Sequence, residues 1–276
     1  MCRRLLLALL LVSSVSALHA QAPGAATAGR TPEQQVYDRY LAWLFGVPVE
    51  QRDADLLKRY RAALAQEGVA AAEIDRQITV IDRNGRQLEA DRWNTFFTTD
   101  KPRFNVMPNT FMTQIAEVRT PGTALDMGMG QGRNSIWLAR QGWKVTGFDP
   151  AVQAMAVAQQ NAASLGLTLT TVEARDDTFD WGDNKWDLIL LSYAGCDPAN
   201  VPRIEKASKP GGVLIMEAFH IDATKTIKIG GSICSTGELP HMFQGLRTIH
   251  YEEPMALPDF GQVRMRIVRF AAEKPR

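Results

Sequence analysis

Residues 124–134 have the sequence ALDMGMGQGRN, a short apolar run that breaks into three alternating glycines. About one helix further on, residues 145–149 have the sequence VTGFD, a second apolar run that ends in a carboxylate. The order predicts a strand, a glycine turn, a helix and a second strand. An α/β domain presents a ribose-bearing ligand in this way, at the carboxyl ends of its parallel strands.

The spacing of the glycines separates two kinds of nucleotide site. The dinucleotide fingerprint needs a third glycine after two intervening residues, and Arg133 stands at that position here. The Walker pattern is absent as well, because no Gly-Lys-Ser/Thr follows the glycines. The spacing therefore disfavours a pyrophosphate cradle.

The remaining pattern is Asp-x-Gly-x-Gly-x-Gly, formed by Asp126, Gly128, Gly130 and Gly132. It resembles motif I of the class I S-adenosylmethionine-dependent methyltransferases, and Asp149 stands where that family has the acidic residue of motif II. The resemblance implies S-adenosylmethionine as the cofactor. It covers roughly residues 93–271.

Each residue of this pattern has an expected contact with the cofactor. Glycines have no Cβ, so the backbone can approach the methionyl part, while the free N–H groups of the following helix favour its carboxylate. Asp126 is expected to hold the ammonium group, directly or through water. Asp149 is expected to accept both ribose hydroxyls, since an ionised carboxylate only accepts hydrogen bonds. The alternative is that the glycine turn and the acidic strand end only form a βαβ connection and bind no cofactor.

An aromatic segment precedes the glycine motif. In tellurite-resistance-type and related small-molecule methyltransferases, a Trp-containing helix and a Pro-Asn-x-Phe helix start lie over the cofactor cleft, and this segment looks like both. The resemblance implies that Trp93, Phe97 and Phe111 cover the cleft, with Arg103 and Asn109 as polar members of the pocket. The alternative is a hydrophobic seam between an N-terminal appendage and the core.

Beyond residue 149 the alternation of strands and helices continues, which predicts a doubly wound, seven-stranded, mostly parallel sheet. A Pro-Gly-Gly turn at 210–212, typical of the family, precedes one of the apolar strands. The predicted strands are 167–172, 186–191 and 213–219, then the closing antiparallel strands 246–252 and 263–271. The predicted helices are 152–165, 201–207 and 239–244.

Further site candidates follow the predicted strands. The family usually places an Asp after its third strand, for the adenine amino group; ungapped counting gives Arg175, and a slip of one residue gives Asp176, which we choose. Ser192 is a candidate for the cofactor site at the end of the next strand. Tyr193 and His220 are weak catalytic candidates, because methyl transfer needs a base only if the acceptor must lose a proton.

Metal and nucleic-acid chemistry are disfavoured. The histidines at 220, 241 and 250 have no paired ligand spacing. Residues 191–194 differ from the Asn/Asp-Pro-Pro-Tyr loop of nucleic-acid amino-methyltransferases, which argues against a base-flipping enzyme. The 31 basic and 30 acidic residues give a net charge of +1, so no basic field indicates a nucleic-acid partner.

The predicted organisation has four parts. Residues 1–20 have the charged, apolar and small-residue regions of a secretory signal, with cleavage expected after Ala20. Residues 21–31 are expected to be a disordered leader, 32–90 a helical appendage and 91–276 the methyltransferase domain. The apolar core of the signal is too short to span a bilayer, so we expect no stable membrane span after cleavage.

The signal predicts export, to the periplasm or outside the cell, or a cytoplasmic location if the leader does not function. Export conflicts with the cytoplasmic supply of the cofactor. After cleavage Cys196 and Cys234 remain; an oxidising compartment would permit a disulfide between them but does not require one.

The leading hypothesis is methyl transfer from S-adenosylmethionine to a small-molecule acceptor by in-line displacement. The first alternative is an exported protein that binds S-adenosylmethionine or a related nucleoside without turnover, since a fold does not prove catalysis. The second is a nicotinamide-dependent oxidoreductase, against which the alternating glycines count. Neither the acceptor nor the oligomeric state is predicted.

Overall fold

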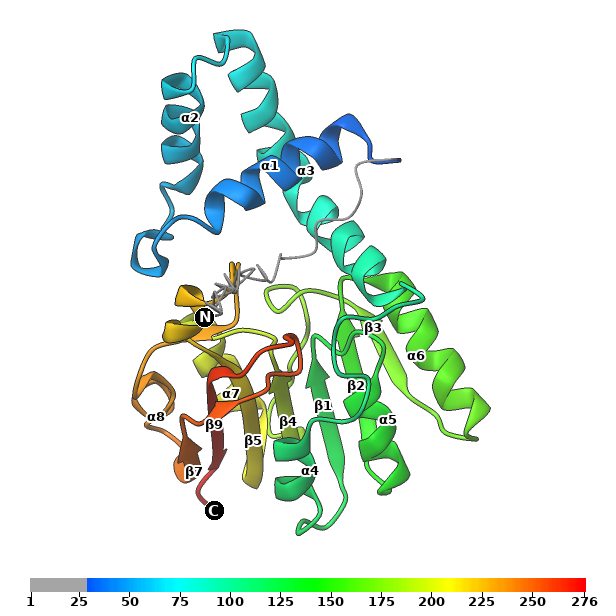
Figure 1. Cartoon of the computed structure of the whole chain (residues 1–276). Coiled ribbons are helices and arrows are strands. Elements are labelled where there is room, and N and C mark those ends of the chain that lie inside the picture. The colour runs from blue at the N-terminus through cyan, green and yellow to red at the C-terminus, as the bar shows by residue number, and fades with distance from the viewer. Residues whose placement is uncertain (1–28) are drawn as a thin grey trace, which may run out of the picture.

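The protein consists of an α/β body and three N-terminal helices that stand off from one end of it (Figure 1). The structure, a computed structural model, describes residues 29–276. The predicted signal peptide and most of the predicted leader lie outside the described residues. Within the described part, no helix has the length and apolar character needed to cross a bilayer.

The body is built on a twisted sheet whose strands follow the order β3-β2-β1-β4-β5-β9-β7. The first five strands of this path are parallel, and β9 and β7 close it in antiparallel pairing. The predicted doubly wound, mostly parallel fold is therefore confirmed, with two short strands, β6 and β8, added beside the path. The bounds are β1 Thr123–Met127, β2 Lys144–Asp149, β3 Thr170–Glu173, β4 Trp186–Ser192, β5 Ser208–His220, β6 Ile233–Cys234, β7 Arg247–Glu252, β8 Met255–Ala256 and β9 Met265–Glu273.

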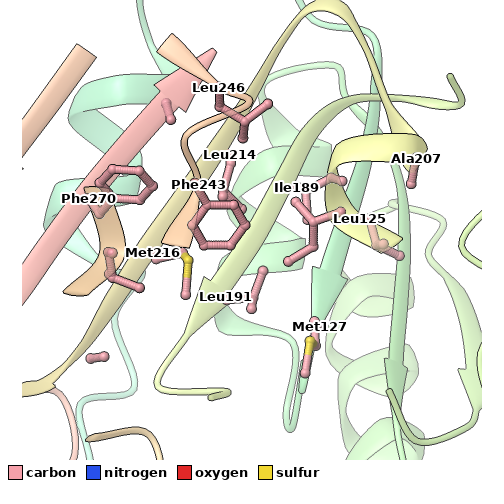
Figure 2. Close-up of a cluster of buried hydrophobic side chains, with 14 of the residues drawn as sticks. Leu125, Met127, Ile189, Leu191, Ala207, Leu214, Met216, Phe243, Leu246 and Phe270 are labelled. Atoms are coloured by element: carbon pink, nitrogen blue, oxygen red, sulfur yellow. The ribbon is translucent and has the colours of Figure 1, made fainter. Parts of the chain in front are cut away.

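Helices cover both faces of the sheet, which is why its central strands are apolar almost throughout. One face packs on α4, α5 and α6; the other packs on α7 and α8. Each face has its own apolar cluster: the first cluster lies under α4, α5 and α6, and the second under α7 and α8. Alternate residues of β4 divide between them, with Leu188 and Leu190 in the first cluster and Ile189 in the second. Figure 2 shows Ile189 and Leu191 in the second cluster, with Phe243. The bounds are α4 Thr110–Ala116, α5 Arg133–Arg140, α6 Val152–Ser164, α7 Val201–Ala207 and α8 Glu238–Met242.

The predicted helical appendage forms α1 (Pro32–Leu44), α2 (Leu56–Gln66) and the first part of α3 (Ala71–Phe97). It has apolar clusters of its own, built from the helically spaced side chains that the sequence indicated. The sequence separates a helix near 70–81 from a Trp-containing helix, but α3 continues through both and across the predicted boundary at residues 90 and 91. Gly85 lies inside this helix, where a Cβ would be 3.7 Å from the Tyr37 ring, an ordinary contact.

Several contacts hold the appendage to the body, among them the ion pair of Arg86 with Asp177 at 2.9 Å. The side-chain oxygen of Asn94 on α3 accepts a hydrogen bond from Gln153 N at 2.8 Å, which caps the start of α6. In the segment between α1 and α2, Arg52 donates to the carbonyls of Ile229 and Gly230, at 3.1 and 3.2 Å. The end of α3 lies beside the glycine loop of the body, where Gln131 donates to the Phe97 carbonyl.

Candidate functional site

The glycine loop between β1 and α5 requires glycine at all three of its alternating positions. Gly128, Gly130 and Gly132 have φ values of +67°, +51° and +73°, which L side chains rarely adopt. The space is also limited, since a Cβ on Gly132 would lie 2.7 Å from the Cβ of Ala158 on α6. Of the three glycines, Gly128 is exposed and lines the adjoining cleft, whereas Gly130 and Gly132 are buried against Phe97 and Ala158.

Asp149 lies at the end of β2, directly beside this loop. Its Oδ2 accepts a hydrogen bond from Gly130 N at 2.9 Å, and its Oδ1 accepts one from Ala151 N at 2.8 Å. Its exposure is only 4%, and burial raises the pKa of its carboxyl. Each carboxylate oxygen can accept a second bond, so two acceptor positions remain for ribose hydroxyls. Asp149 does not line the adjoining cleft in this structure, so its contact with a ribose stays a prediction.

Asp126 is buried at the end of β1, with an exposure of 1%. Its Oδ2 accepts a hydrogen bond from the Ser135 hydroxyl at 2.7 Å, and burial raises the pKa of the carboxyl to about 6. The carboxylate thus bonds to α5 and does not line the cleft beside the glycine loop. A direct contact with an ammonium group is not what this arrangement favours.

A cleft of about 290 Å³, partly open to solvent, adjoins the glycine loop. Three of the predicted site residues, Phe97, Gly128 and Ser192, line it. The sequence did not indicate Phe104 or Phe260. The lining residues are Phe97, Phe104, Gly128, Met129, Gln131, Arg133, Asn134, Ser192 and Phe260.

Aromatic rings from three parts of the chain cover this cleft. Phe104 lies 5.3 Å from Phe97 and 5.8 Å from Phe260, measured between ring centroids. Trp93 stacks on Phe97 at 5.6 Å and donates its indole N–H to Glu89, and so reaches the cleft only through Phe97. Of the three predicted cover residues, Phe97 lines the cleft, and the role of these rings over a bound cofactor stays a prediction.

Two predicted members of the pocket lie elsewhere. Arg103 is exposed, and the neighbouring Phe104 is the residue that turns inward. Phe111 is buried on the sheet side of α4, where it packs against His250. The packing alternative therefore describes Phe111. In this irregular segment no periodicity separates an inward residue from its neighbour.

A buried polar network lies beneath the cover. Asn109 donates from Nδ2 to Glu217 and to Asp259, at 2.7 Å each, while its Oδ1 caps α4. Arg133 donates to Asp259 at 2.7 Å and to Ser192 at 3.2 Å. The structure thus brings the predicted Asn109 and Ser192 together. Asp259 is a new member, from the segment between β8 and β9.

The two catalytic candidates are poorly suited to accept a proton. Burial, together with the carboxylates of Glu217 and Asp259, raises the pKa of Tyr193 well above its usual value, so its phenol stays neutral. His220 accepts a hydrogen bond from Asp222 N at 3.0 Å through Nδ1, and its Nε2 pairs with the Thr236 hydroxyl at 2.8 Å. Burial lowers the pKa of His220, which does not line the cleft.

The remaining predictions concern the adenine position and metals. Asp176, in the turn after β3, accepts a hydrogen bond from Asn200 Nδ2 at 2.9 Å. Its predicted contact with adenine stays a prediction. Among residues 29–276 there is no group of three or more His, Cys, Asp and Glu side chains placed to hold a metal ion.

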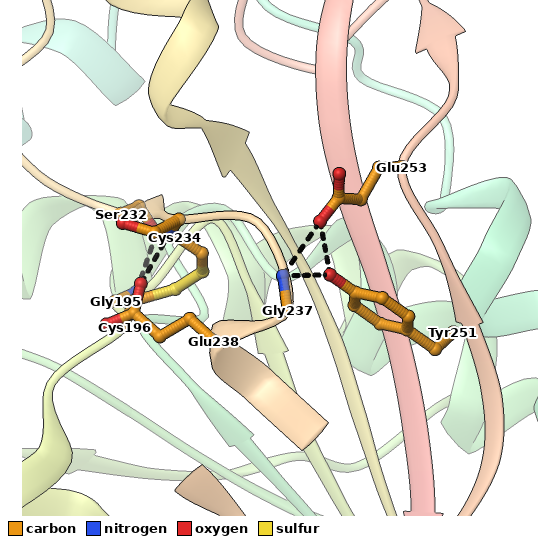
Figure 3. The surroundings of a disulfide bond; sticks show 9 residues. Gly195, Cys196, Ser232, Cys234, Gly237, Glu238, Tyr251 and Glu253 are labelled. Carbon is orange, nitrogen blue, oxygen red and sulfur yellow. Dashed lines mark hydrogen bonds between the residues drawn. A yellow bond between two sulfur atoms is a disulfide. The ribbon is translucent and has the colours of Figure 1, made fainter. Parts of the chain in front are cut away.

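A disulfide joins Cys196 to Cys234, the pair that the sequence left open (Figure 3). Their Cα atoms are 5.8 Å apart, and the bond ties the segment after β4 to β6. Beside it, Gly195 N donates to the Ser232 hydroxyl at 2.7 Å. The segment that follows Ser192 at the cleft is therefore held to the sheet covalently.

Residues 124–212 match the family model described as "Methyltransferase domain". The matched range runs from β1 into the first residues of β5 and contains the glycine loop and Asp149. The chain thus carries a class I S-adenosylmethionine-dependent methyltransferase domain, as the resemblance implied.

Two curated proteins match parts of the chain. The ribosomal RNA small subunit methyltransferase C of Alcanivorax borkumensis is 45% identical over 47 residues, which are 17% of this chain and 14% of that protein. The ubiquinone biosynthesis O-methyltransferase of Pectobacterium atrosepticum is 28% identical over 144 residues, 49% of this chain and 58% of that protein. The chain therefore spans less than two thirds of either relative.

Solved structures share the fold. The N-methyltransferase NodS of Bradyrhizobium japonicum, in complex with S-adenosyl-L-homocysteine, matches with a TM-score of 0.51 and 15% identity, over 68% of this chain and 98% of that one. TehB of Haemophilus influenzae matches with a TM-score of 0.49 and 19% identity, over 60% and 62%. Likeness at such identities shows the fold alone, so it does not assign the tellurite-resistance-type branch.

Proposed function

We propose that this protein transfers a methyl group from S-adenosylmethionine to a small-molecule acceptor. The observation that carries the proposal is the contact between Asp149 and Gly130 N, which joins the ribose-type carboxylate to the glycine loop at the carboxyl edge of the sheet. This contact lies inside the region that matches the methyltransferase domain. The family match gives no support to a nicotinamide-dependent oxidoreductase.

The residues fit the proposed cofactor. The glycine positions leave no room for side chains, and Asp149 keeps two acceptor positions. When bound, the cofactor supplies an electrophilic methyl group on a sulfonium. The protein contributes alignment of that group with the acceptor, and the rings of Phe97, Phe104 and Phe260 exclude water from the cleft.

We propose that the reaction uses no dedicated base from this chain. Tyr193 is a neutral phenol and both nitrogens of His220 have partners. Glu217 is buried, with one oxygen bonded to Asn109 and the other to Arg269 at 2.8 Å. An acceptor that is already nucleophilic, or that loses its proton to water, suits this site.

A small acceptor is supported by the narrow cleft and by the near-zero net charge, which offers no field for nucleic acid. The O-methyltransferase of ubiquinone biosynthesis, which the chain matches over 144 residues, is named for a small-molecule pathway. The match to a ribosomal RNA enzyme covers only 47 residues.

We also propose that the protein is exported, with a mature chain that begins at Gln21. The Cys196–Cys234 disulfide supports this, since disulfides persist in oxidising compartments. N-terminal sequencing of protein from the native host should find Gln21 or a neighbouring residue first. Cytosolic protein with an intact Met1 would overturn the proposal and remove the conflict over cofactor supply.

Two measurements test the activity. Calorimetry should show that S-adenosylmethionine and S-adenosylhomocysteine bind, and that NAD does not. Labelled S-adenosylmethionine should then transfer its methyl group to the low-molecular-mass fraction of a host extract, and not to the nucleic-acid or protein fractions. No binding would overturn the proposal. Binding with no transfer to any fraction would favour the non-catalytic binder.

A further inference from the structure

Arg133 lies at the junction of the glycine loop and α5, with its guanidinium turned into the polar network. Its side chain is 10% exposed and lines the cleft. One nitrogen, Nη2, donates to Asp259 at 2.7 Å and to Ser192 at 3.2 Å, and Nη1 donates to the Met107 carbonyl at 2.7 Å. The first turn of a helix, where Arg133 stands, also presents free backbone N–H groups to an anion.

Asp259 is held at this place by more than Arg133. Asn105 donates to its Oδ1 at 2.9 Å, and the backbone N–H of Asn105 donates to its carbonyl at 2.7 Å. Asn109 donates to the same Oδ2 that Arg133 contacts. The carboxylate of Asp259 is therefore a protein anion inserted between the glycine helix and the cover of the cleft.

The ion pair and the closure of the cleft are coupled through Phe260. This ring follows Asp259 directly, lines the cleft, and lies 5.8 Å below the guanidinium of Arg133. The cleft of about 290 Å³ includes space that is open to solvent, and the Phe260 ring forms part of its wall. Displacement of Phe260 would therefore enlarge the space for a nucleoside with an amino-acid tail.

The chemistry of the pair favours an exchange of anions. A guanidinium matches a carboxylate in geometry and charge, whatever molecule the carboxylate belongs to. Separating a buried ion pair is costly when nothing replaces the lost partner, and a second carboxylate at Arg133 removes that cost. Asp259 would keep its two asparagine partners when it leaves Arg133.

We infer that Arg133 binds the carboxylate of the cofactor's methionine moiety, and that Asp259 occupies Arg133 until that carboxylate replaces it. In the exchange the Asp259 carboxylate keeps its asparagine partners, and Phe260 loses the guanidinium that lies over its ring. The inference rests on the proposed function, because it requires a cofactor with an amino-acid tail at the glycine loop. It makes Arg133 the binding residue and Asp259 its internal competitor.

Calorimetry with two ligands tests this inference. S-adenosylhomocysteine carries the carboxylate, whereas 5′-methylthioadenosine has the adenine, ribose and thioether without it. The readout is the ratio of their affinities, which cancels any general loosening of the cleft. In Arg133→Gln the preference for S-adenosylhomocysteine should fall by about tenfold or more, the range expected for a lost hydrogen bond to a charged group.

The second variant, Asp259→Asn, keeps the size and removes the competing charge. Its preference for S-adenosylhomocysteine should rise by about threefold or more. The matched control is Asp183→Asn, which removes a carboxylate from the exposed pair with Lys206 just ahead of β4, at the opposite edge of the sheet. Its affinity ratio should equal that of the wild type.

If Arg133→Gln left the ratio of the two affinities unchanged, including by an equal loss of affinity for both ligands, the role of Arg133 would be overturned. An unchanged or lower ratio in Asp259→Asn would overturn the exchange. If Arg133→Gln does not fold, Arg133→Lys keeps the charge without the forked donor, and its ratio should still fall. Wild-type protein that binds neither ligand would instead refute the proposed function.

Discussion

The ring of Phe97 occupies the space that a side chain at residue 130 would need. A Cβ on Gly130 would lie 2.7 Å from Cζ of Phe97, closer than any ordinary contact. Gln131, the next residue, donates a hydrogen bond to the Phe97 carbonyl. The end of α3 and the glycine loop are therefore fitted to each other.

Gly130→Ala should destabilise the fold by more than the cost of placing alanine at a positive φ. The control is Gly166→Ala, which also has positive φ, +70°, but has open space at its Cβ, so it should lose only about 1–2 kcal/mol. Gly130→Ala should lose more in urea unfolding, because Phe97 must shift. In a Phe97→Ala background the excess should vanish. Equal losses for the two glycines would contradict the fitted contact.

Asp149→Ala should weaken both the cofactor site and the fold. The variant loses two proposed ribose contacts, each a hydrogen bond to a charged group worth about 1.5–3 kcal/mol, so affinity should fall by at least about tenfold for S-adenosylhomocysteine and 5′-methylthioadenosine alike. It also leaves Gly130 N and Ala151 N without their acceptors. Calorimetry below the melting transition checks the first effect, and unchanged affinity would refute the assignment.

Asp126 should make stability depend on pH in a defined direction. Burial raises the pKa of its carboxyl from 3.8 to about 6, so the folded protein holds this proton more tightly than the unfolded chain. Its contribution to stability is therefore largest at low pH and decreases as pH rises from about 4 to about 6. At about 1.4 kcal/mol for each pKa unit, the decrease is up to about 3 kcal/mol.

Asp126→Asn removes this ionisation and can keep the bond to Ser135. Urea unfolding of both proteins from pH 4 to 7 should show the variant gaining on the wild type as pH rises. A wild type that instead gains on the variant over this range would show that the buried carboxylate is stabilised in its charged form.

The disulfide should make stability sensitive to reductant. The bond closes a loop of 38 residues, for which the chain-entropy relation gives about 4 kcal/mol. The double variant Cys196→Ser, Cys234→Ser should be less stable than the oxidised wild type by roughly this amount. Dithiothreitol should lower the free energy of unfolding of the wild type and leave that of the variant unchanged. If free-thiol titration found two thiols in protein from the native host, the pairing would be wrong.

The part of the site that the sequence predicted is the part that local geometry determines. Gly128, Gly130 and Gly132 stand where the backbone has positive φ, and Asp149 ends a neighbouring parallel strand, so spacing alone brings them together. Asp259 could not be found in this way. It meets Arg133 across 126 residues, from a short irregular segment with no pattern of its own.

The cover was predicted as a feature but not residue by residue. Arg103 and Phe104 differ by one position in a segment without periodicity, and only tertiary packing decides which turns inward. The length of α3 was missed for a similar reason. The sequence separates a helix near residues 70–81 from a Trp-containing helix, whereas α3 runs unbroken from Ala71 to Phe97.

Because α3 is one continuous helix, it links the appendage directly to Phe97 at the cleft. At 1.5 Å per residue its 27 residues extend about 40 Å, from the packing with α1 and α2 to Phe97 on the glycine loop (Figure 1). A tilt of the N-terminal end of α3 would be transmitted to its C-terminal end, because no break interrupts the helix. Asn94 attaches α3 to the start of α6. A force that tilts α3 is therefore expected to move Phe97 against the glycine loop, and by reciprocity a ligand that fixes Phe97 would resist the tilt.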